Sequence, residues 1–220
     1  MCDRDAKTAL YEQFARVGKS LGSGKRLELM DLLAQGERTV DGLAKAAGLG
    51  RTTASAHLQT LKQANLVATR RDGTKIYYRL AGTDVAALYA LVRTVASDHL
   101  PDVEAASAAY LGPEPDQVTR DELLRRARSG RVTVIDVRPR EEYLAGHIPD
   151  AISVPLDELP DRLAELPADQ ETVAYCRGAY CVLAHDAVRL LAAEGRPASR
   201  LSDGMLEWRL AGLPVAMDAH

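Results

Sequence analysis

The chain has 220 residues, 46% hydrophobic and 27% charged, a balance typical of a globular protein long enough for two small domains. It shows no charged-then-apolar leader and no apolar run near about 18 residues, so neither export nor membrane spanning is indicated. Its three cysteines do not have the spacing of a disulfide scaffold or a zinc finger. We therefore expect a cytoplasmic protein with reduced thiols and with no metal or other cofactor.

The net charge of −3 is divided unevenly along the chain. Residues 1–100 contain 15 Lys and Arg against 10 Asp and Glu, whereas residues 101–220 contain 13 against 21. All six lysines precede position 76. A basic half joined to an acidic half predicts that only the first half binds a polyanion such as DNA.

Three helices are predicted in the first half of the chain, after about residue 26. An apolar face over residues 27–33 ends at Gly36 and predicts the first of them. A short second helix begins at Thr39 and ends at the glycines of residues 48–50, and a third covers residues 51–64. A short helix, a glycine-bearing turn and a helix with a polar outer face predict a helix-turn-helix. The candidate DNA-binding residues on the third helix are Arg51, Thr52, Thr53, Ser55, Ala56, His57, Gln59 and Lys62.

A β-hairpin is predicted next. Strand-like runs at residues 66–70 and 75–80 flank residues 71–74, whose Asp-Gly pair is a strong hairpin-turn signal. Helices predicted at residues 8–21 and 84–99 flank the whole module, and the second carries an apolar stripe wide enough for a dimer interface. The hairpin suits a wing that contacts DNA phosphates, through the candidate residues Arg70, Arg71 and Lys75.

Three stretches carry a family resemblance: Ser-Ala-His-Leu-Gln-Thr-Leu at 55–61, Ala-Asn-Leu-Val at 64–67, and the hairpin at 70–80. Over about residues 6–99 the chain resembles the ArsR family of winged-helix repressors. The resemblance implies a homodimer that binds a palindromic double-stranded operator and places two recognition helices in successive major grooves, about 34–36 Å apart.

The chain departs from the metal-sensing members of that family. Where those members carry a Cys-Val-Cys triplet, residues 39–41 read Thr-Val-Asp. Where their other common site begins Asp-x-His, residues 84–86 read Asp-Val-Ala. Soft metals prefer thiolates and zinc prefers imidazoles, so we expect no metal site in this half. The signal that this regulator senses must enter elsewhere.

The sequence of the second half predicts an α/β domain. Residues 101–117 are rich in Ala, Pro and acidic side chains and predict a linker, after which Thr119 can cap a helix. Strand-like runs then alternate with helical ones, which predicts a small parallel sheet whose ligands bind beyond the carboxyl ends of its strands. The strands are expected at residues 132–137, 152–154, 172–175 and 199–201, and the helices at 141–145, 156–166 and 181–194.

A strand-to-helix loop in this half contains two thiols. We take it as the candidate catalytic loop, and its residues are Cys176, Arg177, Gly178, Ala179, Tyr180 and Cys181. Backbone amides and a helix dipole at such a loop favour thiolate over thiol. A thiolate at Cys176 can therefore attack sulfur–sulfur bonds.

The loop also belongs to a set of four pieces that resemble a rhodanese domain, over about residues 117–217. The other pieces are Ile-Asp-Val-Arg at 135–138 with Glu-Glu-Tyr at 141–143, Gly-His-Ile-Pro-Asp-Ala at 146–151, and Asp-Gly-Met-Leu-Glu-Trp at 203–208. The resemblance implies that Cys176 accepts a sulfane sulfur from thiosulfate, polysulfide or a persulfide. The predicted architecture is thus an α+β winged helix-turn-helix domain at residues 1–100, a linker at 101–117, and an α/β rhodanese-like domain with a parallel sheet at 118–220.

Cys181 departs from many catalytic rhodaneses, which end this loop with Arg or another polar residue. It is either a thiol that resolves a persulfide on Cys176 or a small buried residue. Asp136, Arg138 and His147 are expected to support the fold, and Trp208 to lie in the core. Cys2 is expected to be an inert terminal residue.

Three functions are compatible with this sequence. The leading hypothesis is a transcriptional repressor that senses reactive sulfur through persulfidation of Cys176. The alternative is a rhodanese-type sulfurtransferase whose DNA-binding domain regulates its own expression. The third is a thiol-based sensor of arsenic or oxidants that uses Cys176 and Cys181, although two thiols per subunit are few for arsenic.

Overall fold

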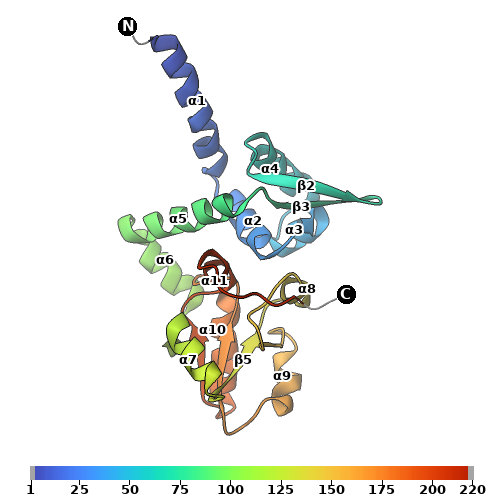
Figure 1. Ribbon diagram of the computed structural model, residues 1–220, viewed down its shortest axis with the longest axis vertical. Helices are drawn as coiled ribbons and strands as arrows, with labels where there is room; N and C mark the ends of the chain where they lie inside the picture. Colours follow the sequence, from blue (N-terminus) through green and yellow to red (C-terminus); the bar gives the residue numbers. More distant parts are fainter. Residues whose placement is uncertain (1–2, 218–220) are drawn as a thin grey trace. The chain divides into compact units, whose positions relative to one another are not determined.

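The structure is a computed structural model that describes residues 3–217, so Cys2 lies outside the described residues. The chain divides into two compact units, with the boundary between Tyr89 and Ala90. This boundary falls inside helix α5 (Thr83–His99), which Figure 1 shows as one unbroken helix. None of the helices within residues 3–217 is long and apolar enough to cross a membrane.

The first unit is a helical module with a small antiparallel sheet. Its sheet has the strand order β1-β3-β2, and β2 and β3 form the long hairpin seen in Figure 1 around Gly73. Gly73 has a positive φ of 58°, which the turn requires and glycine adopts without strain. Its elements are α1 (Arg4–Leu21), α2 (Gly24–Gln35), β1 (Arg38–Thr39), α3 (Val40–Ala46), α4 (Arg51–Gln63), β2 (Val67–Asp72), β3 (Lys75–Leu80) and the first part of α5.

Apolar residues at helical spacing form the core of this unit. Leu29 and Met30 of α2, Leu43 of α3 and Leu58 and Leu61 of α4 are completely buried. Because these residues recur at three- and four-residue intervals, each helix turns its polar face outward. The third predicted helix is confirmed as α4, and its outer face is available for contact with a partner.

The second unit is built on a five-stranded sheet of order β4-β8-β7-β5-β6, in which every pair of neighbours is parallel. After α5 come α6 (Asp102–Leu111), β4 (Gln117–Val118), α7 (Arg120–Arg128), β5 (Val132–Asp136), α8 (Arg140–Leu144) and β6 (Ile152–Ser153). They are followed by α9 (Leu159–Arg162), the 3-10 helix η1 (Leu163–Glu165), β7 (Glu171–Tyr175), α10 (Val182–Ala193), β8 (Ala198–Leu201) and α11 (Met205–Leu210).

Two separate apolar clusters cover the two faces of this sheet. One joins Ile135 and Ala174 to residues of α9 and α10 and includes both loop cysteines. The other joins Val134 and Val173 to residues of α7 and α11, with Trp208 at its centre. The alternation of side chains along β5 and β7 explains the division, since successive residues of a strand point to opposite faces.

The predicted fold class is confirmed, and several boundaries differ from the sequence-based expectation. Thr119 caps α7 by accepting a hydrogen bond from Glu122 N at 3.3 Å, as predicted. Helix α6 lies within residues 101–117, where the sequence predicted a linker, and strand β4 begins at the last of these residues. Residues 156–166, predicted as one helix, contain only the short α9 and η1.

Candidate functional site

The Cys176 loop connects the carboxyl end of the central strand β7 to helix α10. The beginning of α11 fixes the first half of the loop, because Met205 N donates to Cys176 O at 2.9 Å and Leu206 N to Arg177 O at 3.1 Å. A turn closes the second half, in which Cys181 N donates to Gly178 O at 3.1 Å. The loop is therefore a rigid part of the unit, placed where parallel sheets bind ligands.

The two thiols lie close together but in different surroundings. Cys176 is 2% exposed and its Sγ donates to Cys181 O at 3.3 Å, whereas Cys181 is 8% exposed and is the N-cap residue of α10. Burial, together with a hydrogen bond to the Cys181 sulfur, raises the pKa of Cys176 well above its ordinary value. The same hydrogen bond and the positive charge of Arg177 lower the pKa of Cys181.

This difference in pKa between the two thiols departs from the sequence-based expectation that the helix dipole favours a thiolate at Cys176. The helix begins at Val182, so its N-terminus acts on Cys181, whereas Cys176 lies five residues earlier. Backbone hydrogen bonds from Gly178 and Ala184 nevertheless favour the thiolate of Cys176 and lower its pKa, although burial outweighs them. The pair thus consists of a deeply buried thiol with a raised pKa, Cys176, and a neighbouring thiol with a lowered pKa, Cys181.

Arg177 is paired within the unit. Its Nε lies 3.0 Å from both carboxylate oxygens of Glu142, and its terminal nitrogen lies 2.7 Å from Oε1. Glu142 of α8 is 1% exposed, so this bidentate pair is largely removed from water. Arg177 therefore contributes positive charge beside the thiols while its side chain is held in one place.

Gly178, Ala179 and Tyr180 form the part of the loop that faces α5 and α11. A Cβ built on Gly204 would lie 2.2 Å from Gly178 N, so the loop and the start of α11 touch backbone to backbone. Tyr180 is 38% exposed, and the guanidinium of Arg93 lies 5.1 Å from the centre of its ring. Ala179, which lies between Gly178 and Tyr180 in the sequence, is half-buried.

A buried polar network lies beside the loop at the ends of β5 and β7. Asp136 and Arg138 are both fully buried and form an ion pair with a shortest distance of 2.6 Å. Tyr175 donates to Asp136 Oδ2 at 2.6 Å and accepts a hydrogen bond from Ile148 N at 3.0 Å. The expected structural role of Asp136 and Arg138 agrees with this arrangement, because a buried charge requires a well-bonded partner.

The remaining expectations for the second unit concern His147 and Trp208. His147 stacks on Tyr143 with ring centres 3.7 Å apart, and its Nδ1 lies 3.1 Å from Tyr143 O, as expected of a residue that supports the fold. Trp208 is 1% exposed, which confirms its place in the core. Within residues 3–217, no group of three or more His, Cys, Asp or Glu side chains is arranged to hold a metal ion.

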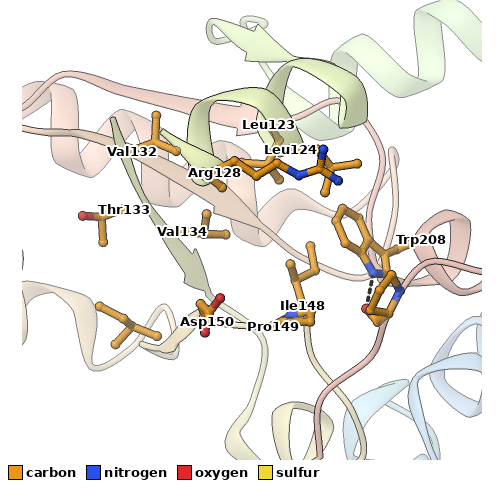
Figure 2. Close-up of a pocket in the computed structure, with 13 residues that line it drawn as sticks. Leu123, Leu124, Arg128, Val132, Thr133, Val134, Ile148, Pro149, Asp150 and Trp208 are labelled. Carbon is orange, nitrogen blue, oxygen red and sulfur yellow. Dashed lines mark hydrogen bonds between the residues drawn. The ribbon is translucent and has the colours of Figure 1, made fainter. Parts of the chain in front are cut away.

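An apolar cavity of about 510 Å³ lies on the sheet face opposite the thiols. Figure 2 shows it between Leu124 of α7, Val134 of β5 and Trp208, whose Nε1 donates to Pro214 O at 2.8 Å. None of residues 176–181 lines it. The cavity is therefore separate from the thiol pair.

The predicted DNA-binding residues of α4 all lie outside its buried stripe of Ala54, Leu58 and Leu61. Most are exposed, and Ser55 and His57 are half-buried. Arg51 pairs with Asp41 of α3 at 3.1 Å, and Gln59 Nε2 lies 3.4 Å from the hydroxyl of Tyr78. The exposed members of the set are Arg51, Thr52, Thr53, Ala56, Gln59 and Lys62.

The basic residues of the hairpin differ in their partners. Arg70 forms ion pairs with Glu37 and Asp72 and lies 4.8 Å from the centre of the Tyr77 ring. Arg71 Nε donates to Gly73 O at 3.0 Å, and Lys75 is exposed at the other side of the turn. Arg71 and Lys75 are therefore better placed than Arg70 to bind a phosphate, because Arg70 must first break its ion pairs with Glu37 and Asp72.

Sequence reasoning missed several residues that surround the loop. Glu142 belongs to the Glu-Glu-Tyr stretch, which could have identified it as a neighbour of the loop. Tyr175 carries no motif signal of its own, and Arg93 lies on a helix that the sequence assigned to dimerisation. Glu207 is part of the Asp-Gly-Met-Leu-Glu-Trp stretch, which could have identified it as a neighbour of the loop.

Comparisons with known proteins define the class. Residues 23–69 match the family of bacterial regulatory proteins of the arsR type, and residues 119–211 match the rhodanese-like domain. Together with the fold, these matches define a winged helix-turn-helix transcriptional regulator that carries a rhodanese-like domain.

One relative matches nearly the whole chain. The HTH-type transcriptional regulator Rv0324 of Mycobacterium tuberculosis is 62% identical over 211 residues, which cover 96% of this chain and 93% of that protein. The chain belongs to the same family of HTH-type transcriptional regulators.

Two further similarities cover one half each. A protein named sulfurtransferase from Allochromatium vinosum is 33% identical over 91 residues, which cover 41% of this chain and 84% of that protein. A solution structure of the homodimeric winged helix-turn-helix domain Mb0332 from Mycobacterium bovis, described as a possible ArsR-family regulator, is 56% identical. It covers 46% of this chain and 94% of that fragment, with a TM-score of 0.43.

Proposed function

We propose that this regulator senses reactive sulfur through the Cys176–Cys181 pair and changes its affinity for operator DNA in response. The observation that carries the proposal is the thiol pair itself. Two buried cysteines, with Cys176 Sγ donating to Cys181 O at 3.3 Å, lie at the carboxyl end of the central strand of a rhodanese-like domain, in the same chain as a helix-turn-helix.

The proposed chemistry begins with a proton transfer within the pair. Cys181 lies next to Cys176, so in its thiolate form it can accept the Cys176 proton while Cys176 attacks. Because its lowered pKa makes Cys181 a weak base, the transfer is completed only as the new sulfur–sulfur bond forms. With thiosulfate as donor, the Cys176 thiolate attacks the outer sulfur, a new sulfur–sulfur bond forms, and sulfite leaves with the electron pair of the broken bond. With a low-molecular-weight persulfide as donor, the leaving group is the corresponding thiolate.

The persulfide anion so formed is stabilised by hydrogen bonds from the loop. The amides that already favour the Cys176 thiolate, those of Gly178 and Ala184, are the nearest donors. Cys181, once deprotonated again, can attack the inner sulfur of a protonated Cys176 persulfide and release hydrogen sulfide anion, which leaves a disulfide. No external oxidant is required: the first step transfers the sulfane sulfur while the donor's leaving group takes the electron pair, and in the second step the outer sulfur takes the electron pair as it leaves.

DNA binding is proposed to use a homodimer. Leu10, Tyr11 and Phe14 of α1 and Leu91 and Val95 of α5 are exposed apolar residues, and a second copy of the chain would cover them. A dimer presents two copies of α4 to successive major grooves of a palindromic operator, with the basic hairpins on the flanking phosphates. The base-contacting candidates are those of α4, and Arg70, Arg71 and Lys75 are the phosphate-contacting candidates.

The test measures DNA affinity and sulfur loading on the same samples. The probe is a palindromic duplex that the reduced protein selects from a random pool, and the donor is inorganic polysulfide. For the wild type we expect intact mass to increase by one or more sulfur atoms and the dissociation constant to change about 5–150-fold, the usual range for allosteric coupling. Cys176→Ser is expected to lose both responses. Cys181→Ser is expected to load sulfur more slowly, because the proton acceptor is gone, and to form no internal disulfide.

The hypothesis of a sulfurtransferase enzyme predicts a different result from that of a sulfur sensor. Sustained transfer of sulfur from thiosulfate to cyanide, with a DNA affinity that is the same before and after loading, would show an enzyme whose DNA-binding unit does not respond to sulfur. The similarity of this half to the Allochromatium vinosum sulfurtransferase is the observation that favours making this measurement. Unchanged release of DNA by Cys176→Ser on polysulfide treatment would refute sensing at this loop.

A further inference from the structure

Arg93 of α5 contacts the thiol loop from a helix that lies outside the rhodanese-like sheet. Its side chain is only 16% exposed and pairs with Glu207 of α11 at 3.1 Å, and its guanidinium lies over the ring of Tyr180 at 5.1 Å. A Cβ built on Gly178 would lie 3.2 Å from an Arg93 terminal nitrogen. These contacts all lie within residues 90–220, the second compact unit.

Glu207 extends this contact to the backbone of the loop. Its Oε2 accepts a hydrogen bond from Gly204 N at 3.0 Å, and Gly204 lies against Gly178 with no space for a side chain between them. The next two amides after Gly204, those of Met205 and Leu206, donate to the carbonyls of Cys176 and Arg177. A single guanidinium therefore contacts both the aromatic ring at the end of the loop and the carboxylate that orders its beginning.

Addition of sulfur to Cys176 must disturb this packing. Cys176 is 2% exposed within a cluster of buried residues, and a packed interior has few spaces large enough for an extra atom. The loop must then shift, because the strand β7 behind Cys176 is fixed in the middle of the sheet. The residues at the outer side of the loop, Gly178 and Tyr180, are those that touch Arg93.

Helix α5 also belongs to the DNA-binding unit. Tyr89, one turn before Arg93, is buried there, and its hydroxyl donates to Asp31 of α2 at 3.1 Å. The boundary between the units falls within this helix, which carries Tyr89 on one side of the boundary and Arg93 on the other.

We propose that Arg93 is a positioning residue that transmits the chemical state of the Cys176 loop to α5, and through α5 to the DNA-binding unit. The inference rests on the proposed sulfur-sensing function and goes beyond it by naming the side chain that carries the signal. In the reduced state Arg93 fixes α5 to Tyr180 and Glu207. In the sulfur-loaded state the loop shifts, this contact changes, and α5 adopts a different position relative to the loop.

The test compares two arginines that touch the same structure from different helices. Arg93→Met removes the charge while retaining much of the length of the side chain. Arg120→Met is the matched control, since Arg120 of α7 pairs with Asp203 at 2.8 Å and donates to Glu207 O at 3.3 Å but does not belong to α5. Arg93→Lys, which preserves a charge for Glu207, is the conservative variant. Each full-length variant is treated with inorganic polysulfide, and intact mass and DNA affinity are measured before and after.

We expect Arg93→Met to load sulfur on Cys176 to the same extent as the wild type. Its ratio of dissociation constants before and after loading should fall to about 1, because the coupling free energy is lost. Arg120→Met should retain the wild-type ratio, and Arg93→Lys should recover part of it. A wild-type ratio in Arg93→Met would overturn the proposal, as would an equal loss in Arg120→Met.

Hydrogen exchange separates this proposal from the sensing function on which it rests. Sulfur loading is expected to change the exchange of α5 amides in the wild type and not in Arg93→Met. If the wild type loads sulfur without a change in DNA affinity, the sensing function fails, whereas an Arg93-dependent change in α5 would still support the coupling. If exchange in α5 is the same in both proteins before and after loading, the coupling through Arg93 is excluded.

Discussion

The two loop thiols show how position within a few residues determines acidity. Cys176 is the more buried and donates its proton toward Cys181, whereas Cys181 begins α10 and lies near Arg177. A lowered pKa means that the thiolate of Cys181 is present at a lower pH than that of an ordinary cysteine near about 8.5, and the thiolate is the reactive form. Cys181, the second cysteine of the loop, is thus the one that ionises at the lower pH.

This difference predicts the order of alkylation. In limited treatment of the full chain with iodoacetamide, Cys181 should be modified before Cys176, and its rate should reach half-maximum at a lower pH than that of a free cysteine. In Cys176→Ala the hydrogen bond to Cys181 is lost, so the pKa of Cys181 rises and this midpoint moves to higher pH. Peptide mass spectrometry over a pH series provides the measurement. Modification of Cys176 before Cys181 would contradict the assignment of Cys181 as the more acidic thiol. A pH midpoint of Cys181 that Cys176→Ala leaves unchanged would also contradict it.

At the scale of elements, the thiol loop depends on the beginning of α11. The Asp-Gly-Met-Leu stretch supplies a glycine where two backbones touch, followed by two amides that bond to the loop carbonyls. The loop is therefore defined by two segments about 28 residues apart in sequence, and a defect in either one should distort it.

Alanine substitutions at the two glycines should differ in cost. In Gly204→Ala the new Cβ meets the backbone of Gly178 at 2.2 Å, which cannot move aside, so we expect a loss of about 1–3 kcal/mol in unfolding free energy. In Gly178→Ala the nearest atoms are the ends of Arg93 and Glu207 at 3.2 Å, which can rotate, so the loss should be smaller. Trp208 is the only tryptophan and lies in α11, so urea unfolding followed by its fluorescence reports on this region. Equal costs would contradict the close approach of the two backbones.

Elements with a strong periodic pattern were predictable, and elements fixed by tertiary pairing were not. Helix α4, the β2–β3 hairpin and strands β5 and β7 follow from helical spacing, an Asp-Gly turn and apolar runs. The two-residue strands β1 and β4 exist only because β3 and β8 pair with them.

The candidate site was predictable to a similar degree. The position of the Cys176 loop follows from a strand–loop–helix pattern and from a family resemblance. The relative acidity of its thiols does not, because the start of α10 and the direction of the hydrogen bond between them are properties of the folded loop. Arg93 gave no signal, since its partners Tyr180 and Glu207 lie far along the chain.

At the scale of the whole molecule, charge distinguishes the two halves of the chain. The first hundred residues carry the basic excess and all the lysines, whereas the remainder is acidic and repels DNA phosphates. This division predicts that the winged helix-turn-helix, and not the acidic half, contacts DNA.

The wing provides a quantitative test of this division. Each phosphate contact contributes about 0.9 to the slope of log affinity against log salt, so removal of one basic residue per subunit from a dimer should reduce the slope by about 1.8. We expect that reduction for Lys75→Ala and Arg71→Ala, across both specific and unrelated duplexes. Arg70→Ala should have a smaller effect, because Glu37 and Asp72 already neutralise Arg70 and must be displaced before it can bind a phosphate. Fluorescence anisotropy at several salt concentrations gives the slopes, with Arg128→Ala, an exposed basic residue of the acidic half, as the control that should leave them unchanged. A full effect at Arg70 with none at Lys75 would show that the wing meets DNA through its other face.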